Sequence, residues 1–253
     1  MKLVISPEYE HLREWLSEDK LIDSKGGDLL YNGRNRIVSY STPSGEKIVI
    51  KKHRKHDIIK RFIYSFFRAN KARRSFENAI ELRKRGFSTP HEVAYAEQSC
   101  MGLVIQVYYI CAFTDYNAIR PELIDREPFD KELAVAYAEY VASLHEAGIL
   151  HRDLNPTNVL YKKEKGRYAF ELIDINRMRF YKASVPKAEC MENLTLFWWL
   201  SDVYRYILDV YAAKRGWCRD DVNEALCVKQ RHDSRWIWRK RYTGWLKRNI
   251  LRK

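Results

Sequence analysis

The most informative stretch of this sequence is residues 151–158, which read His151-Arg152-Asp153-Leu154-Asn155-Pro156-Thr157-Asn158. Asp153 offers a carboxylate that can take a proton from a hydroxyl group, and Asn158 offers an amide oxygen five positions later. Before this stretch, apolar residues recur at helical spacing from residue 133 to residue 144, with Asp130 as a cap and Gly148 as a stop. We therefore expect two chemically competent side chains on one loop, which follows a helix and the short strand Ile149-Leu150.

A second carboxylate stands at the end of a predicted strand. The segments Val159–Tyr161 and Tyr168–Ile173 flank the turn Lys165-Gly166 and predict a hairpin. Asp174 comes directly after the second strand, sixteen residues beyond Asn158. The pattern thus places a carboxylate at the end of a strand.

A lysine in the first third of the chain completes the set. Residues 47–51 are rich in β-branched side chains and follow the turn at residues 43–45, which predicts a strand. Side chains alternate between the two faces of a strand, so Val49 and Lys51 share one face while Ile48 and Ile50 share the other. This alternation favours Lys51 over the neighbouring Lys52 as the functional lysine.

The three features resemble protein kinases in their order and context. Residues 151–158 match H-R-D-L-x-x-x-N, Asp174 stands where kinases keep the Asp of D-F-G, and Lys51 ends a match to V-A-I-K. The resemblance implies an α+β, protein-kinase-like two-lobed fold of minimal, atypical form. Its N-lobe, residues 1–112, would carry a small mixed sheet with a helix, and its C-lobe, residues 113–253, would be mainly helical.

Local patterns predict the remaining elements of both lobes. Asn32-Gly33 signals a hairpin between residues 29–31 and 36–40, and residues 71–85 form a helix that Gly86 ends. Helical spacing at residues 58–67 and beyond residue 191 predicts further helices, and residues 91–96 and 103–110 read as strands. A hinge near residues 112–121 would join the lobes.

The kinase resemblance assigns chemical roles to the candidate residues. Phosphoryl transfer depends on positioning and charge neutralisation. Asp153 would orient the acceptor hydroxyl and take its proton, and Lys51 would bind the α- and β-phosphates of ATP. Asn158 and Asp174 would hold Mg²⁺ through oxygen atoms, and Val49 would cover the adenine.

Two further assignments are less direct. On the helix over residues 71–85, Glu77 is the expected ion-pair partner of Lys51, and Glu81, one turn later, is the alternative. The chain has no G-x-G-x-x-G motif, so Asn32 and Gly33 would provide a degenerate cover for the phosphates.

Departures from the protein-kinase pattern point to another branch of the superfamily. Residues 174–176 are Asp-Ile-Asn instead of D-F-G, no A-P-E follows, and Asn155 stands where protein kinases usually have lysine. At these and other positions the chain resembles the Kdo/WaaP lipopolysaccharide kinases, over roughly residues 30–209. The residues that carry this resemblance are 32–35, 49–51, 67–79, 86–90, 151–158 and 172–177.

The Kdo/WaaP resemblance implies an ATP-dependent kinase that phosphorylates a sugar hydroxyl, on Kdo or a heptose-like sugar, of the lipopolysaccharide inner core. Such enzymes act at the cytoplasmic face of the inner membrane of Gram-negative bacteria. The alternatives are an atypical protein kinase of the RIO type and a pseudokinase that serves as a binding module. Asn155 and the missing A-P-E argue against the first, and the presence of Lys51, Asp153, Asn158 and Asp174 argues against the second.

Charge and composition support an anionic partner. The chain has 46 Lys and Arg against 33 Asp and Glu, a formal charge of +13. Residues 235–253 carry eight Lys or Arg, no acidic residue, and aromatic residues including Trp238, Tyr242 and Trp245. Such a segment is typical of a helix that lies on an anionic inner-membrane surface, although a helix packed on the C-lobe with a solvated basic face is the alternative. No nucleic-acid-binding module is recognisable, so nucleic acid is not an expected partner.

The remaining features predict a cytoplasmic location. The five cysteines are scattered without a C-x-x-C pair, as expected of reduced thiols. The first residues lack the apolar run of a signal peptide, and no apolar stretch reaches the length of a spanning helix.

Overall fold

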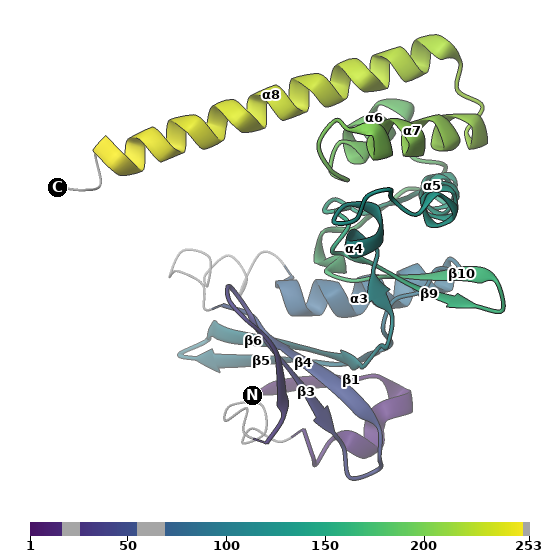
Figure 1. The fold of residues 1–253 in the computed structure, drawn as a ribbon. Coiled ribbons are helices and arrows are strands. Elements are labelled where there is room, and N and C mark those ends of the chain that lie inside the picture. The colour runs from purple at the N-terminus through teal and green to yellow at the C-terminus, as the bar shows by residue number, and fades with distance from the viewer. Residues whose placement is uncertain (17–25, 55–68, 250–253) are drawn as a thin grey trace. The chain divides into compact units, whose positions relative to one another are not determined.

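The computed structural model describes residues 1–16, 26–54 and 69–249. These residues form two compact units (Figure 1). The first comprises residues 1–116 together with residues 171–177, and the second comprises residues 117–170 and 178–253. The sequence predicted one boundary, after residue 112. In the structure the short segment that contains Asp174 also belongs to the first unit, which the sequence did not predict.

The first unit is built on a six-stranded sheet. Its strands are β1 (Lys2–Ile5), β2 (Asp28–Asn32), β3 (Arg36–Ser41), β4 (Lys47–Lys52), β5 (Glu92–Cys100) and β6 (Leu103–Ala112). They lie in the order β1-β5-β6-β4-β3-β2, and each pairing is antiparallel, where the sequence suggested a mixed sheet. The predicted hairpin at Asn32-Gly33 is the β2–β3 connection.

Both faces of this sheet are covered. One face packs its apolar side chains, among them Ile48 and Ile50, with Leu12 of the 3₁₀ helix η1 (Pro7–Leu12). The other face packs Tyr95 and Tyr109 against Phe76 of α3 (Lys71–Lys84). The side chain of Asn70 accepts hydrogen bonds from two backbone N–H groups of the first turn of α3, and Gly86, at φ +84°, follows its C-terminus. The helix predicted at residues 58–67 lies outside the described residues.

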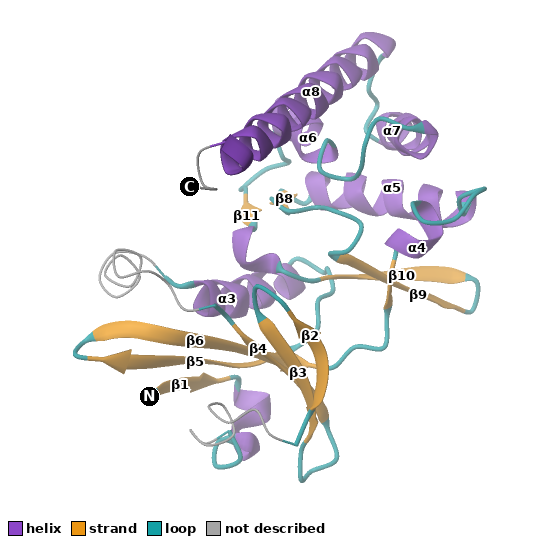
Figure 2. Ribbon diagram, turned by 60° about the vertical axis from the view of Figure 1, so that its left-hand side comes forward, coloured by secondary structure: helices purple, strands orange, loops and turns teal. Residues whose placement is uncertain are grey.

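The second unit is mainly helical, as expected. It contains α4 (Arg120–Leu123), α5 (Lys131–Glu146), α6 (Lys187–Leu194), α7 (Asp202–Lys214) and α8 (Arg219–Asn249). The carboxylate of Asp130 accepts a hydrogen bond from the backbone N–H of Leu133, which confirms the predicted cap of α5. Figure 2 shows α5, α6 and α7 close together, with α8 extending beyond them.

Short strands carry the loops of the second unit. The strand β8 (Ile149–Leu150) pairs with β11 (Arg179–Phe180). A three-stranded sheet has the order β10-β9-β7, formed by β7 (Asn117–Ala118), β9 (Val159–Glu164) and β10 (Arg167–Leu172). The predicted hairpin around Lys165-Gly166 is therefore confirmed. The last two residues of β10 belong to the 171–177 segment, which ends in η2 (Ile175–Arg177).

Candidate active site

The first unit brings Lys51 and Asp174 together. The Nζ atom of Lys51 lies 2.8 Å from Oδ1 of Asp174, although the residues are 123 positions apart in sequence. The predicted alternation along β4 explains why this lysine is used. Ile48 and Ile50 are buried in the core, so Val49 and Lys51 point to the opposite face. Lys52 falls on the core side of the strand, with its Nζ 5.6 Å from the centre of the Tyr108 ring.

Three hydrogen bonds fix the segment that carries Asp174. The backbone N–H of Leu172 donates to the backbone oxygen of Ser88 over 3.0 Å, and the Thr89 hydroxyl donates to the backbone oxygen of Leu172 over 2.7 Å. From α3, the side-chain amide of Asn78 donates to the backbone oxygen of Ile175 over 2.7 Å. The loop after α3 and the helix itself thus position Asp174, a role for Thr89 and Asn78 that the sequence did not indicate.

Asp174 has an uncommon backbone conformation. Its φ of +55° lies in the left-handed region, which costs an L-residue about 1–2 kcal/mol and is tolerated best by Asn and Asp. The side-chain amide of Asn176 donates to the same Oδ1 that pairs with Lys51, over 2.8 Å. The Asp-Ile-Asn variant of D-F-G therefore supplies a hydrogen bond to the carboxylate that the glycine of D-F-G could not supply. Such conformations concentrate at functional sites.

The surroundings of Asp174 carry an excess of positive charge. Burial lowers the pKa of Lys71 at the start of α3, and the nearby cations Arg34 and Arg177 lower that pKa further. The carboxylate of Asp174 acts on the pKa of Lys71 in the opposite direction. Lys51 adds another cation, so one carboxylate stands among several positive groups, an environment that favours a polyanion such as a triphosphate.

The structure does not pair Glu77 with Lys51. The Arg73 side chain donates to Oε1 of Glu77 over 2.7 Å, and the Glu77 side chain is 49% exposed. The alternative, Glu81, pairs with Arg85 over 2.7 Å. The prediction of Glu77 as the lysine partner is therefore wrong for this structure. Asn78, the next residue of α3, faces the Asp174 segment. Glu77 lies on the helix surface, where it pairs with Arg73 one turn earlier.

The β2–β3 connection has few hydrogen-bond donors available to a phosphate. The backbone N–H of Gly33 donates to the backbone oxygen of Asn35 over 3.1 Å, so this amide is used within the turn. Asn32, the last residue of β2, is exposed. The side chain of Val49 is half-buried on the same face of β4 as Lys51, and its contact with adenine stays a prediction.

The second unit brings Asp153 and Asn158 together on the loop after β8. The side-chain amide of Asn158 donates to the backbone oxygen of Asp153 over 2.9 Å, and that of Asn155 donates to Oδ1 of Asp153 over 3.3 Å. The backbone N–H of Asp153 donates to Nδ1 of the buried His151 over 3.2 Å. His151 is thus part of the scaffold of the loop, and the Asp153 carboxylate is oriented by its neighbours.

A buried network of hydrogen bonds connects this loop with α5, α6 and α7. Asn193 of α6 donates from Nδ2 to the backbone oxygen of His151 over 2.9 Å, and its Oδ1 lies 3.0 Å from Nε2 of His145. Nδ1 of His145 lies 2.8 Å from the hydroxyl of Tyr211 on α7. Because Asn193 offers an oxygen to Nε2, the proton of neutral His145 resides on Nε2, and Nδ1 accepts from Tyr211. Burial lowers the pKa of His145 to about 4.

Each unit offers an oxygen atom of the kind that Mg²⁺ prefers. In the first unit, Asp174 supplies a carboxylate. In the second unit, the side chain of Asn158 uses its nitrogen for Asp153, which leaves its oxygen as the atom able to bind a cation. Within the described ranges, no three His, Cys, Asp or Glu side chains gather as a metal site. Mg²⁺ typically uses one or two protein oxygens together with phosphate oxygens and water, so a sparse set of protein ligands fits this ion.

The comparison with solved structures identifies the fold. A chain described as WaaP in complex with acyl carrier protein is 20% identical, with a TM-score of 0.55. The match covers 98% of this chain and 97% of that one. The α+β kinase-like fold expected from the sequence is thereby confirmed.

Sequence comparisons place the chain within this group. A curated relative is 27% identical over an alignment of 161 residues that covers 60% of this chain. It is a probable bifunctional tRNA threonylcarbamoyladenosine biosynthesis protein of Methanosarcina barkeri (strain Fusaro / DSM 804), and the match spans 27% of that protein's length. The model of the lipopolysaccharide kinase (Kdo/WaaP) family matches residues 30–195, more than half of the chain. The chain therefore belongs to the lipopolysaccharide kinase (Kdo/WaaP) family.

Proposed function

We propose that this protein uses ATP to phosphorylate a sugar hydroxyl of the lipopolysaccharide inner core, on Kdo or a heptose-like residue. Its family membership already implies a phosphotransferase. The observation that carries the proposal further is the 2.8 Å pair between Lys51 and Asp174, because it brings together the lysine that we expect to bind phosphate and the carboxylate that we expect to bind Mg²⁺.

Nucleotide binding follows from the charges of the first unit. Lys51, Lys71, Arg34 and Arg177 would attract the phosphates of ATP. Asp174 and Asn158 would hold Mg²⁺, which when bound neutralises charge on the β- and γ-phosphates. Lys51, which pairs with Asp174 here, would turn to the phosphates. Val49 would contact the adenine from the same strand face.

Transfer requires an activated hydroxyl. The Asp153 carboxylate would accept the proton of the sugar hydroxyl, while the oxygen of that hydroxyl forms a bond to the γ-phosphorus. The bond from the γ-phosphorus to the bridging oxygen breaks, and ADP leaves. Asn155 holds Oδ1 of Asp153 at 3.3 Å and adds no charge. This neutral neighbour replaces the lysine usual in protein kinases and is compatible with a carbohydrate acceptor. The reaction would take place in the cytoplasm, where ATP is available.

The test is transfer of labelled phosphate from ATP to three acceptors. We expect incorporation into delipidated core oligosaccharide, and none into a generic protein substrate or in the absence of an acceptor. Asp153→Asn serves as the matched inactive control, because it removes the charge and keeps the shape. Mass spectrometry of lipopolysaccharide from a deletion strain should show the loss of one phosphate. Labelling of the protein substrate alone would support a protein kinase, and ATP binding without transfer to any acceptor would support a pseudokinase.

A further inference from the structure

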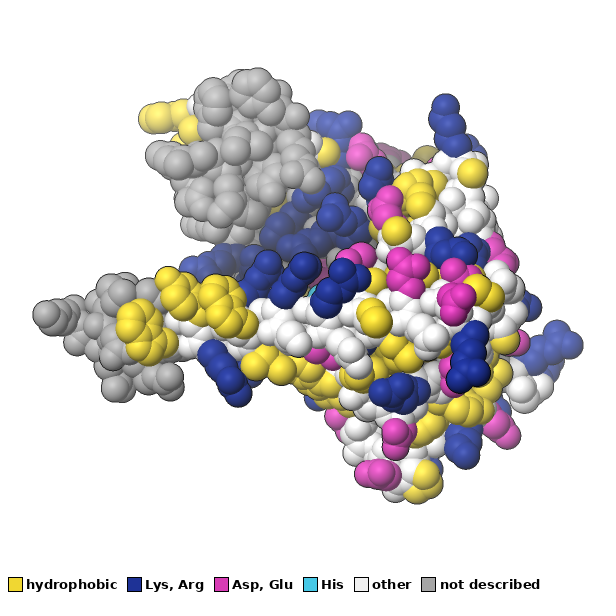
Figure 3. Space-filling view, turned by 90° about the horizontal axis from the view of Figure 1, so that it is seen from above, with side chains coloured by type: hydrophobic (Ala, Val, Ile, Leu, Met, Phe, Trp, Pro, Cys, Tyr) yellow, Lys and Arg dark blue, Asp and Glu magenta, His cyan; other side chains and the backbone are white. Residues whose placement is uncertain are grey.

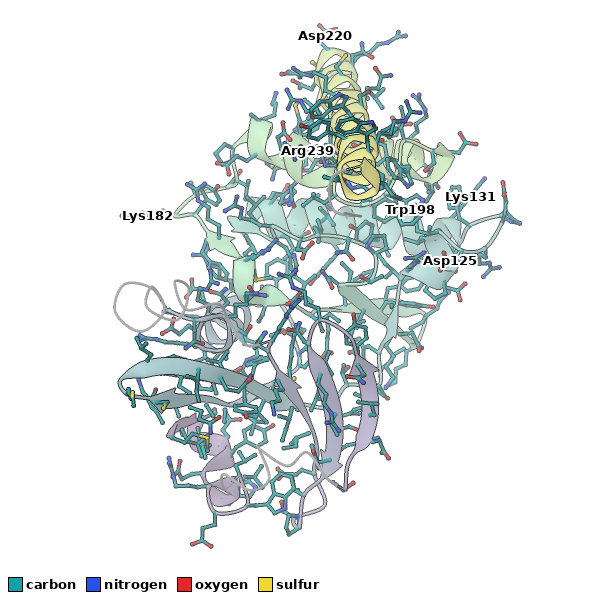
Figure 4. All side chains as sticks on the ribbon, turned by 90° about the vertical axis from the view of Figure 1, so that its left-hand side faces the viewer. Asp125, Lys131, Lys182, Trp198, Asp220 and Arg239 are labelled. Atoms are coloured by element: carbon teal, nitrogen blue, oxygen red, sulfur yellow. The ribbon has the colours of Figure 1, made fainter. Side chains whose placement is uncertain are left out.

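The long helix α8 has two parts with different surroundings. Its first part packs on α6 and α7, and Ala225, Val228 and Lys229 are buried there. The buried Nζ of Lys229 donates to Oδ1 of Asp233 over 2.7 Å and to the backbone oxygen of Thr195 over 3.1 Å. From Ser234 onward, each side chain of α8 that the structure describes is exposed. In Figure 4, Asp220 marks the first part of α8 and Arg239 the second.

An aromatic stripe lies on the exposed part. Trp238, Tyr242 and Trp245 are 64%, 48% and 52% exposed, and they follow one another at helical spacings of four and three. Their rings stack, with centroids 5.3 Å apart for Trp238 and Tyr242 and 6.4 Å apart for Tyr242 and Trp245. At about 100° per residue, Trp238 lies on the side of α8 opposite the buried Lys229. The stripe therefore does not serve the packing of α8 on its own unit. Figure 3 shows exposed hydrophobic side chains interspersed with Lys and Arg on this projecting part.

A row of arginines runs beside the stripe. Arg231, Arg235 and Arg239 follow at intervals of four and line a pocket of about 230 Å³ between α6 and α8. The pocket also contains His232, Trp236 and one carboxylate, that of Glu192. Among the described residues, no carboxylate forms an ion pair with Arg235 or Arg239, and the sequence has no acidic residue from position 234 to its end. The pocket thus has a surplus of positive charge suited to a phosphate group.

We propose that residues 231–245 of α8 form a docking surface for an anionic phospholipid bilayer. Trp and Tyr side chains favour the boundary between headgroups and acyl chains, and a helix with a basic face lies in that boundary along its length. Trp238, Tyr242 and Trp245 enter the boundary, while Arg235 and Arg239 bind lipid phosphates. No helix among the described residues is long and apolar enough to cross a membrane, so the contact we propose is with the surface.

The charge and the aromatic stripe together select this occupant. A bilayer of anionic lipids presents phosphates over an apolar interior, which matches an arginine row beside an exposed apolar stripe. An acidic protein would satisfy the arginines, and the WaaP chain of similar fold is described in complex with acyl carrier protein. That class of partner is one outcome of the test. The inference does not depend on the proposed kinase activity, because vesicle binding is measured without nucleotide.

The experiment measures sedimentation of the full chain with vesicles of equal parts phosphatidylcholine and phosphatidylglycerol, compared with phosphatidylcholine alone. We expect binding to the anionic vesicles that weakens as salt rises, because the charges become screened. Arg235→Gln combined with Arg239→Gln should weaken it by about tenfold or more, since each charge contributes separately near the leaflet. Trp238→Ser combined with Trp245→Ser should weaken binding and reduce quenching of tryptophan fluorescence by brominated lipids.

Matched controls separate docking from general charge and from folding. Lys131→Gln combined with Lys214→Gln removes two exposed charges of the same unit and should leave vesicle binding unchanged. Point variants are preferred to truncation, because the Trp236 ring packs 4.6 Å from that of Trp199 and removal of the whole segment would expose that contact. All variants should keep the wild-type Tm. Binding equal in all variants, or independent of lipid charge, would overturn the proposal. The proposal would also be overturned if, in a parallel binding assay with purified acyl carrier protein, the arginine variants lost binding to that acidic protein and kept wild-type binding to the anionic vesicles.

Discussion

The side-chain amide of Asn193 donates a hydrogen bond to the backbone oxygen of His151, which lies 42 positions earlier in the sequence, over 2.9 Å. Both residues are buried. The other end of the Asn193 amide faces His145, so one side chain connects α6, the end of α5 and the loop that carries Asp153. The position of the proposed proton acceptor thus depends on a residue that touches no reacting group.

Asn193→Ala should destabilise the protein and disturb this loop. The substitution leaves the N–H of His145 and the backbone oxygen of His151 without their partner, and each buried unsatisfied group costs about 1–3 kcal/mol. We expect a fall of about 2 kcal/mol or more in the free energy of unfolding, measured by urea denaturation. Asn117→Ala, at an exposed position of the same unit, is the control and should change stability little. Equal effects of the two substitutions would show that the network does not hold the loop.

The His145 network predicts how stability depends on pH. Burial lowers the pKa of His145 to about 4, whereas an unfolded histidine has a pKa near 6.5. Between these values the unfolded state binds more protons, so stability should be undiminished by this group above pH 6.5 and should fall as the pH drops toward 4. The loss should reach about 2 kcal/mol at pH 5.

Urea denaturation between pH 7 and pH 5 measures this dependence. His145→Gln should be less stable than the wild type at pH 7, and its stability should fall less steeply as the pH is lowered. The exposed His11 serves as a control, and His11→Gln should keep the steep fall of the wild type. A steep fall retained in His145→Gln would assign the pH dependence to another group.

The sequence predicted the elements of this fold well because their signals are local. Turn residues and helix caps act over a few positions, so the β2–β3 connection and the start of α5 appear where Asn32-Gly33 and Asp130 indicate. Strand alternation favoured Lys51 over Lys52 as the functional lysine, and in the structure Lys51 is the one that pairs with Asp174. The family resemblance added the order of the motifs.

The partners of the site residues could not be predicted in the same way. A rotation of α3 by one position, about 100°, decides whether Glu77 or Asn78 faces the Asp174 segment, and an amphipathic pattern does not resolve that angle. Asn193 carries no sequence signal, because its role arises only when α6 packs beside the loop after β8. Long-range contacts of single polar side chains depend on tertiary packing, which a single sequence does not reveal.

The two neighbouring lysines of β4 provide an internal control for nucleotide binding. Lys51→Ala removes the cation that faces Asp174, and we expect kcat/KM for ATP to fall by about a hundredfold or more, because a phosphate contact that counts in transfer is lost. Lys52→Ala removes the same charge from the opposite face and should change kcat/KM by less than about threefold. Initial rates over a range of ATP concentrations measure both. Equal losses would mean that the face of β4 assigned to the nucleotide is incorrect.

Replacing Asp174 and replacing Asp153 should impair different steps of the reaction. Asp174→Ala removes a proposed metal ligand and the partner of Lys51, so metal-dependent binding of ATP, measured by calorimetry with and without Mg²⁺, should be lost together with turnover. Asp153→Ala removes the proposed proton acceptor, so ATP should bind nearly as tightly as in the wild type while kcat falls by about a hundredfold or more. Asp125→Ala, an exposed carboxylate that pairs with Arg120, controls for charge and should change neither quantity. If Asp153→Ala instead weakened ATP binding and retained turnover at saturating nucleotide, Asp153 would belong to the nucleotide site and the acceptor hydroxyl would need another base.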